Sequence, residues 1–332
     1  MSLPRYNAVT WRADGCRDRD RWGSLADEPL CARGGKAVGA GGRHLRWRLR
    51  RGSARGRDMR LALAQAPGEL STVVARLDRL RVALPGIAAD GADRGLLPEL
   101  FACGYNIGDA VHERAEPANG RIFGAMRDLS REAGVAIHYG FAEAADGGPQ
   151  LGALCLSARS GPDPPTQTGD PAGVREALLH AGTEMPVFRW RGVTCATLIC
   201  YDAEFPETLR HVATEGAQLV LVPTALGAQW LVVAQNLIPT RVFENGVYVV
   251  YANSAGTENG LAFLGASCIV APDGTAAARA GAAAEILMAD LDIGRVHAAQ
   301  SRLRYLDDRR SLRLDGDQSD SIRGRTTRDC NV

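Results

Sequence analysis

Lysine is nearly absent from this chain of 332 residues, because Lys36 is the only one. A site that needs an ammonium group after position 36 must therefore do without it. Aromatic residues are scarce, at 6%, and no apolar run is long enough to cross a membrane. The eight cysteines form no CxxC pair, and the six histidines form no cluster. These absences argue against a zinc site, and we predict no metal and no cofactor.

The charges are balanced overall but unevenly placed. The formal net charge of +1 gives no general attraction to nucleic acid or to a membrane. Residues 1–58, however, contain thirteen arginines and Lys36 against six acidic residues. Their Gly- and Arg-rich segments show neither helical nor strand periodicity, so we expect a disordered extension. A basic nucleic-acid-binding arm that includes Trp47 is the alternative. Because the thiols are isolated and no secretory leader is visible, we expect a cytoplasmic protein.

From Met59, a candidate start of the folded part, the pattern becomes regular. The expected helices are residues 71–84 with Ser71 as N-cap, residues 118–134, and residues 231–245 with a kink at Pro239. The expected strands are residues 61–65, 96–97, 135–141, 151–158, 187–190, 193–199, 218–223, 247–253, 263–271 and 284–290. We expect the last two strands to pair around the turn at residues 272–274. Alternating strands and helices indicate an α/β protein.

The most informative stretch is residues 193–210, VTCATLICYDAEFPETLR. Its apolar run ends at Cys200, polar residues follow, and Pro206 suits the first turn of a helix. This pattern predicts a strand that ends at the cysteine and a helix whose N-terminus points at it. Such a helix would lower the pKa of the thiol, and backbone N–H groups would face a developing oxyanion. A buried structural cysteine is the alternative.

The segment LICYDAEFPETLR resembles the nucleophile segment of the nitrilase superfamily, the carbon–nitrogen hydrolases, and especially its amidase-like and carbamoylase-like branches. The resemblance covers residues 60–314, and VPTALG at 222–227 is one of its later landmarks. It implies a four-layer α-β-β-α sandwich over residues 59–314, followed by a tail at 315–332. It also implies a homodimer or higher homo-oligomer. The implied reaction is hydrolysis of a small linear amide or N-carbamoyl amine by water, through a thioester on Cys200.

Glu99 is the expected base. It follows a short apolar strand, in the segment PELFACGYN that matches the glutamate motif of the family. A carboxyl group enclosed by Leu97, Leu100 and Phe101 should have a raised pKa, as a proton shuttle requires. The alternative is a solvated loop glutamate.

The chain departs from the family at its third catalytic position, which is a lysine. Here the lysine slot falls near Gln167, and no lysine follows Lys36. Arg159 or Arg175 could supply the cation, although a planar guanidinium does not replace an ammonium. Gln167 could instead donate a neutral, weaker hydrogen bond. A third explanation is that the segment has degenerated, which would leave a catalytically impaired protein that serves as a scaffold for binding or assembly.

The resemblance also implies supporting residues. Glu176 matches a second family glutamate, which positions the lysine and the substrate; an exposed helix residue is the alternative. The N–H of Tyr201 is the expected oxyanion donor. Tyr105 and Trp230 are expected to line the substrate pocket, although either could be a core aromatic. Glu204 could bind a cationic end of the substrate.

Overall fold

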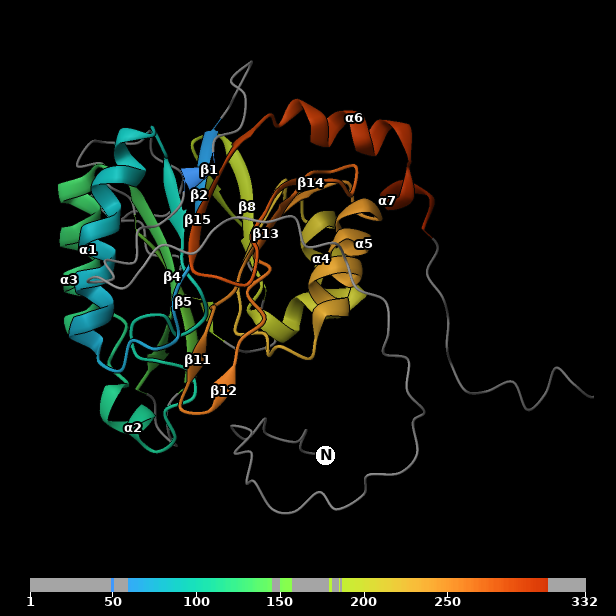
Figure 1. The fold of residues 1–332 in the computed structure, drawn as a ribbon. Helices are drawn as coiled ribbons and strands as arrows, with labels where there is room; N and C mark the ends of the chain where they lie inside the picture. The colour runs from blue at the N-terminus through green and yellow to red at the C-terminus, as the bar shows by residue number, and fades with distance from the viewer. Residues whose placement is uncertain are drawn as a thin grey trace, which may run out of the picture.

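The computed structural model describes residues 49–50, 59–144, 150–156, 179–180, 185 and 187–309. Figure 1 shows these residues as four layers, with α1 and α3 on one outer side and α4 and α5 on the other. Two β-sheets lie face to face between the helices. The predicted four-layer α-β-β-α sandwich is therefore confirmed.

The first sheet has seven strands in the order β1-β15-β2-β3-β4-β5-β6. Their bounds are β1 (Leu49–Arg50), β2 (Met59–Gln65), β3 (Arg94–Leu96), β4 (Ala136–Glu143), β5 (Gln150–Leu156), β6 (Leu179–His180) and β15 (Glu285–Leu291). β2, β3 and β4 run parallel, whereas β15 pairs antiparallel with β2. The segment that follows β3 therefore leaves the sheet at the carboxyl edge of the parallel strands, where ligand sites of α/β sheets are commonly found.

The second sheet has six strands in the order β14-β13-β10-β9-β8-β7. Their bounds are β7 (Val187–Trp190), β8 (Val193–Thr197), β9 (Leu219–Pro223), β10 (Tyr248–Ala252), β13 (Cys268–Val270) and β14 (Ala276–Arg279). β8, β9 and β10 are parallel, so their carboxyl ends also share one edge. A two-stranded sheet, β11 (Thr257–Glu258) and β12 (Leu261–Ala262), lies beyond β10 in the chain.

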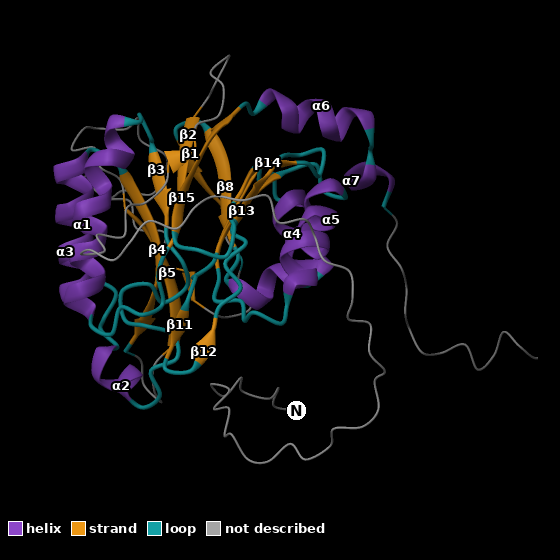
Figure 2. Cartoon of the chain, in the orientation of Figure 1, coloured by secondary structure: helices purple, strands orange, loops and turns teal. Residues whose placement is uncertain are grey.

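Helices α1 and α3 cover one outer side and α4 and α5 the other, whereas α2 and α6 lie at opposite ends of the sandwich (Figure 2). Their bounds are α1 (Val73–Ala89), α2 (Ala110–Arg114), α3 (Arg121–Ala133), α4 (Pro206–Thr214), α5 (Ile238–Phe243), α6 (Gly294–Arg302) and α7 (Tyr305–Asp308). Three apolar clusters hold the layers together: one under α1 and α3, one between the sheets, and one under α4 and α5. Among the described residues, no helix is both long enough and apolar enough to span a membrane.

Two predictions about helix α1 need correction. The N-cap of α1 is Thr72, whose hydroxyl accepts the N–H of Ala75 at 3.1 Å, and not Ser71. The helix also continues through Pro85 to Ala89, beyond the predicted end at residue 84. In addition, β1 lies within the extension predicted to be disordered, and it pairs with β15. The remainder of residues 1–58 lies outside the described residues.

The predicted pairing near the C-terminal end is wrong. β13 pairs with β14, across a turn that contains Gly274, and β15 joins the other sheet beside β2. The short and partly exposed strand β14, AAAR, is not predicted from the sequence. The next strand, β15, is therefore taken as the partner of β13. The helix predicted over residues 231–245 is interrupted as expected near Pro239. Its π-helical segment η2 (Val233–Leu237) leads into α5, where Pro239 lacks the N–H that a regular helix would use.

Candidate functional site

Cys200 and Glu99 come from different sheets and meet at the shared carboxyl edge. Glu99 follows β3, and Cys200 follows β8. The chain does not pass directly from β8 into a helix, because β8 ends at Thr197 and a 3₁₀ turn, η1 (Cys200–Glu204), comes before α4. Pro206 is the first residue of α4, as predicted. Cys200 therefore begins the 3₁₀ turn and does not face the N-terminus of α4 directly.

The backbone at Cys200 is strained. Its φ angle is +48°, in the left-handed region that a side chain with a Cβ seldom adopts. The turn is held by Asp202, whose Oδ2 accepts the N–H of Ile199 at 3.1 Å. Strain of this kind persists only where surrounding contacts over-determine it, and it concentrates at functional sites. The turn thus presents the sulfur of Cys200 at the sheet edge in one fixed orientation.

The segment that follows β9 connects the two groups. The carboxyl group of Glu99 contacts the thiol of Cys200, and the N–H of Ala225 donates to both. The hydroxyl of Thr224 donates to Sγ of Cys200 at 3.0 Å. The backbone of Thr224 is tied to the same site, since its carbonyl accepts the N–H of Glu99 at 3.3 Å. One segment of chain therefore sets the position of both the thiol and the carboxyl group.

The environment of Glu99 suits a proton carrier. Burial, the largest cause, and the nearby charge of Asp202 raise the pKa of Glu99 to about 7, although hydrogen bonds from Cys200 and Ala225 oppose the rise. A group with a pKa near neutrality exchanges protons readily in both directions. Within the described part of the chain, Oε2 of Glu99 has no hydrogen-bond partner. That oxygen can therefore accept a proton from, or return one to, a bound molecule.

The expectation of a lowered thiol pKa is wrong. Burial, followed by the charge of Glu99, raises the pKa of Cys200 well above its ordinary value. The N–H of Ala225 and the hydroxyl of Thr224 act in the opposite direction. Among the described residues, no cation contributes to the pKa of Cys200 or of Glu99. The thiol is therefore neutral at rest, and it must lose its proton during any attack on a substrate.

The other predicted site residues lie at different depths. Tyr105 is 40% exposed, and its pKa is raised first by the charge of Glu99, then by burial and by the charge of Cys200, so its ring lies beside both groups. Tyr201 is exposed and packs edge-to-face on Phe205, with ring centroids 4.8 Å apart. Glu204 is partly buried, and Trp230 is exposed. Only Tyr105 is placed against the thiol and the carboxyl group by these contacts.

Four residues considered for the missing cation and its support lie outside the described residues. They are Arg159, Gln167, Arg175 and Glu176. Lys36, the one lysine of the chain, also lies outside them.

Sequence reasoning missed the polar contacts that surround Cys200. Thr224 and Ala225 belong to the VPTALG segment, which had been recognised only as a landmark. The hydroxyl of Tyr251 in β10 lies 3.1 Å from that of Thr224. The signal for Thr224 was available, because a hydroxyl residue directly after a buried parallel strand lies at the edge where such sites form. Tyr251 carried no such signal, since it lies inside an apolar strand.

A buried ion pair holds the segment that links Glu99 to Tyr105. Arg76 of α1 pairs with Glu258 of β11, and it also donates to the carbonyl of Phe101 at 3.1 Å. Glu258 in turn accepts the N–H groups of Tyr105 at 2.9 Å and Asn106 at 2.8 Å. The segment after Glu99 is therefore fixed from two sides by one pair of charges.

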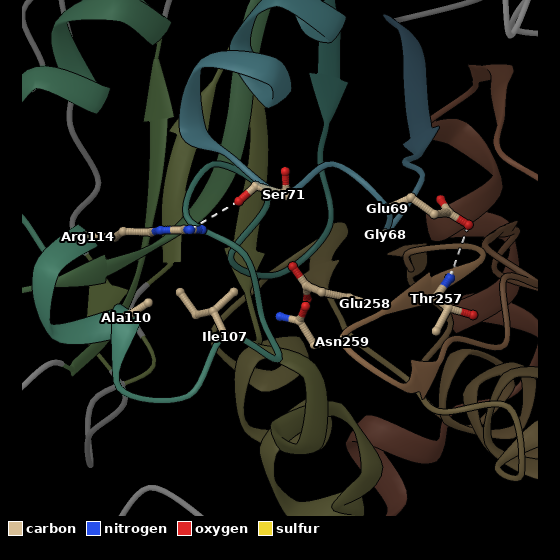
Figure 3. A pocket seen from close by; sticks show the side chains of 9 residues that line it. All are labelled: Gly68, Glu69, Ser71, Ile107, Ala110, Arg114, Thr257, Glu258 and Asn259. Atoms are coloured by element: carbon tan, nitrogen blue, oxygen red, sulfur yellow. Dashed lines mark hydrogen bonds between the residues drawn. The ribbon is translucent and has the colours of Figure 1, made fainter.

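A polar cavity of about 470 Å³ is lined in part by Glu258 of this ion pair (Figure 3). It is lined by Gly68, Glu69, Ser71, Ile107, Ala110, Arg114, Thr257, Glu258 and Asn259. Arg114 donates to the carbonyl of Ser71 at 3.1 Å, and Glu69 accepts the N–H of Thr257 at 3.2 Å. Cys200 and Glu99 do not line this cavity. We therefore assign the chemistry to the Cys200 edge and not to this cavity.

Three other cysteines lie in the interior of the described part of the chain. Cys103, Cys195 and Cys268 are buried, whereas Cys200 is partly accessible. Burial raises the pKa of both Cys103 and Cys268 to about 11, so these thiols are poor nucleophiles. Within the described ranges, no three His, Cys, Asp or Glu side chains gather as a metal site would require.

Comparison with known proteins gives concordant results. Residues 60–301 match the carbon-nitrogen hydrolase family model. A Pseudomonas protegens protein named as the hydrolase in the pqqF 5′ region is 37% identical over 256 residues, which are 76% of this chain and 89% of the relative. An (R)-stereoselective amidase of a Pseudomonas species is 30% identical over 277 residues, covering 80% and 97% of the two chains.

Solved structures agree with these relatives. The crystal structure of an amidase from Nesterenkonia sp. superposes with a TM-score of 0.60 and 30% identity, over 76% of this chain and 97% of that one. A glutamate-to-glutamine variant of the Nesterenkonia sp. AN1 amidase has a TM-score of 0.62 and 30% identity, over 77% of this chain and 95% of that one. Its active-site cysteine carries the acetamide moiety of fluoroacetamide.

Proposed function

Because the chain belongs to the carbon–nitrogen hydrolase family, we propose that it hydrolyses a small linear amide or N-carbamoyl amine through a thioester on Cys200. The observation that carries this proposal is the contact between Cys200 and Glu99, which one segment at Thr224 and Ala225 holds in place. The similarity to amidases favours an amide as the bond attacked. No metal or other cofactor is required in this scheme.

The steps follow from the raised pKa of Glu99 and the raised pKa of Cys200. Glu99 takes the proton of Cys200 as the sulfur attacks the carbonyl carbon, and then gives it to the leaving nitrogen. The amine or ammonia departs and leaves a thioester on Cys200. Glu99 next takes a proton from water, whose oxygen attacks the thioester, and the thiol is restored when the acid leaves. A carboxyl group whose pKa is about 7 can serve in both directions.

Backbone and pocket groups complete the proposal. We assign the oxyanion of the tetrahedral intermediate to the N–H of Tyr201, since the amide after a nucleophile on a tight turn points at the same place. We assign Tyr105 to the substrate pocket because its ring lies beside Glu99 and Cys200. Trp230 and Glu204 are proposed for the outer part of the pocket, and Glu176 for support of the reacting groups. The position near Gln167 is proposed to lack the family cation.

The test is ammonia release from a panel of small amides and N-carbamoyl amines. We expect Cys200→Ala to lower turnover to background and Glu99→Gln to lower it by about 100-fold or more, as loss of a general base does. Cys195→Ala is the matched control, because Cys195 is buried between the sheets, and it should keep full activity. Since Glu99 must be ionised to act, kcat/KM should rise with pH through about 7. Activity that survives Cys200→Ala would refute the proposal.

A second candidate function is supported by one observation. The family lysine is missing, because the chain has no lysine after Lys36. Loss of an oxyanion donor lowers turnover by about 100- to 1000-fold, so the protein could be an impaired member that serves as a scaffold for binding or assembly. In that case fluoroacetamide would leave Cys200 unmodified, and no amide in the panel would be hydrolysed. Labelling of Cys200 that depends on Glu99 would exclude the scaffold.

We also propose a homodimer. Large apolar side chains are exposed on neighbouring segments around η1 and the start of the η2 helix. They are Tyr201, Phe205, Trp230, Leu231 and Val232. Patches of this kind commonly mark interfaces between subunits. Light scattering should give about twice the chain mass of 35.3 kDa, and a monomer at micromolar concentration would contradict the proposal.

A further inference from the structure

The hydroxyl groups of Thr224 and Tyr251 form a chain that ends at the sulfur of Cys200. Oγ1 of Thr224 lies 3.0 Å from Sγ of Cys200 and 3.1 Å from the hydroxyl oxygen of Tyr251. Both side chains are fully buried. The backbone of Thr224 is fixed by the sheet, since its N–H donates to the carbonyl of Ala252 at 2.8 Å. The three groups are therefore held in line by β9, β10 and the turn that carries Cys200.

The hydrogen bonds that join these hydroxyl groups can run in either of two directions. A hydroxyl group carries one hydrogen, so Thr224 can donate to only one of its two neighbours at a time. When Cys200 is a thiol, its S–H donates to the carboxylate of Glu99, so Thr224 is free to donate either to sulfur or to Tyr251. When Cys200 is a thiolate it can only accept, so Thr224 must donate to sulfur and Tyr251 must donate to Thr224. Both arrangements keep every hydroxyl proton on its own oxygen.

We propose that Thr224 is a catalytic residue that donates a hydrogen bond to the Cys200 thiolate, and that Tyr251 is a positioning residue that orients this bond. The inference rests on the proposed function. In the step concerned, the S–H bond breaks, sulfur keeps the electron pair, and the proton moves to the carboxylate of Glu99. Thr224 then donates to the thiolate and Tyr251 donates to Thr224, and no O–H bond breaks.

The surroundings explain why this bond matters here. The charges of Glu99, Glu204 and Cys268 act on the Cys200 sulfur or on the Tyr251 hydroxyl, Tyr105 lies beside Cys200, and Asp202 acts on Glu99. None of these described groups is a cation, and the ionised carboxylates disfavour a thiolate. The stabilising contacts that remain are the N–H of Ala225 and the hydroxyl of Thr224. Burial also raises the pKa of Tyr251 well above its ordinary value, so its hydroxyl stays protonated and able to donate.

The test measures how fast iodoacetamide alkylates Cys200 as the pH is varied, with the modified peptide quantified by mass spectrometry. Thr224→Val keeps the shape of the side chain and removes its hydroxyl. We expect the alkylation rate at pH 7 to fall about 10-fold, and the rate to rise at a higher pH than in the wild type, because hydrogen bonds to charged groups are the strong ones. Thr224→Ser should restore the wild-type profile. A purely structural role for Thr224 would move neither the rate nor the profile.

Tyr251→Phe tests the hydrogen bond between Tyr251 and Thr224. It also replaces Thr224→Val as the test if that variant does not fold. It should lower the rate by about threefold, since the remaining bond loses the polarisation that a neighbouring donor supplies. The matched control is Tyr248→Phe, on the same strand, whose hydroxyl donates to the carbonyl of Asp292 at 3.2 Å, away from the site. Thr197→Val is the control for a buried threonine. Both controls should match the wild type.

The outcomes separate this inference from the proposed function. An unchanged pH profile in Thr224→Val, or in Tyr251→Phe where the first variant is unfolded, would overturn the hydroxyl chain and leave amide hydrolysis untouched. Alkylation needs no substrate turnover. A shifted pH profile of alkylation would therefore support the proposed hydrogen bonds of Thr224 and Tyr251 even if no amide in the panel were hydrolysed.

Discussion

Two arginines, Arg76 and Arg94, are buried to nearly the same extent but differ in the groups that surround their guanidinium groups. Arg76 is 3% exposed and Arg94 is 0% exposed. The guanidinium group of Arg76 pairs with Glu258 and donates to two carbonyl groups. Within the described residues, no hydrogen-bond acceptor lies within reach of any of the three side-chain nitrogens of Arg94. Its guanidinium carbon instead lies 3.9 Å from the ring centroid of Trp190.

The difference shows that burial alone does not determine whether a charged side chain stabilises or destabilises the fold. The charge of Arg76 organises the segment between Glu99 and Tyr105, so we expect its removal to cost stability and activity. Among the contacts that the described residues make, the charge of Arg94 gains only cation–π attraction, from Trp190 and, at 5.8 Å, from Phe188. A buried charge without hydrogen bonds is costly. The same side chain is therefore predicted to respond to substitution with opposite signs at the two positions.

The largest effect is expected at Arg76. Arg76→Met leaves the carboxylate of Glu258 buried without its partner, and breaking a buried pair in this way costs about 3–5 kcal/mol. The free energy of unfolding from urea titration measures the loss. Since Tyr105 and Asn106 are held by Glu258, the variant should also lose turnover with little change in the alkylation of Cys200.

The control for Arg76 is Arg81→Met, on the same helix. Arg81 forms an exposed pair with Asp78, so its loss should change stability by no more than about 0.5 kcal/mol. The double variant Arg76→Met/Glu258→Leu should recover much of the loss, because it removes both charges. A loss below about 1 kcal/mol in Arg76→Met would show that the pair is not the organising contact.

The next effect in size is a gain at Arg94. Arg94→Leu removes a charged group whose N–H donors have no acceptor among the described residues. It places an apolar side chain in the same position. We expect the free energy of unfolding to rise by about 2 kcal/mol, in the range found when buried charges are replaced by apolar residues. Arg127→Leu is the control, since Arg127 lies over Phe123 at 5.9 Å but at the surface. A destabilised Arg94→Leu would mean that the ring contacts outweigh the cost of burial.

The two arginines also mark what the sequence could and could not predict. The nucleophile segment and Glu99 were predictable, because each ends a buried strand and carries a distinctive run of residues. Arg94 is the first residue of β3, two residues before the strand predicted at residues 96–97, so the pattern gave no reason to expect a buried charge there. Arg76 lies on a helix, and its partner Glu258 is 182 residues away. Contacts of that separation depend on how the layers pack, which a local pattern does not contain.

The same limit explains the other errors. The pairing of β13 with β15 was predicted from proximity in the chain, whereas β14 intervenes and β15 completes the first sheet beside β2. The thiol pKa was predicted from a helix N-terminus, yet burial outweighs it because η1 separates Cys200 from α4. In each case a short element, β14 or η1, was not predicted, and the packing around it decided the outcome.

The smallest effect concerns His138, which lies beside Arg94. Burial, and then the charge of Arg94, lower the pKa of His138 well below its ordinary value. The folded state therefore holds this imidazole neutral, while the unfolded chain takes up a proton below about pH 6.5. The sign follows from this difference: His138 stabilises the fold above that pH, and the contribution is lost as the pH falls.

His138→Gln should therefore resist acid better than the wild type. At pH 5.5 the wild type should have lost about 1 kcal/mol more of its pH 7.5 stability than the variant has. Urea titrations at the two pH values measure this difference. In Arg94→Leu the histidine remains buried but no longer faces a guanidinium group, so its protonation in the folded state should occur at a higher pH and the acid loss should level off sooner. If wild type and His138→Gln lost the same free energy of unfolding between pH 7.5 and pH 5.5, the pKa of His138 would not be lowered in the folded state. The electrostatic difference between the surroundings of Arg76 and Arg94 would then lose its support.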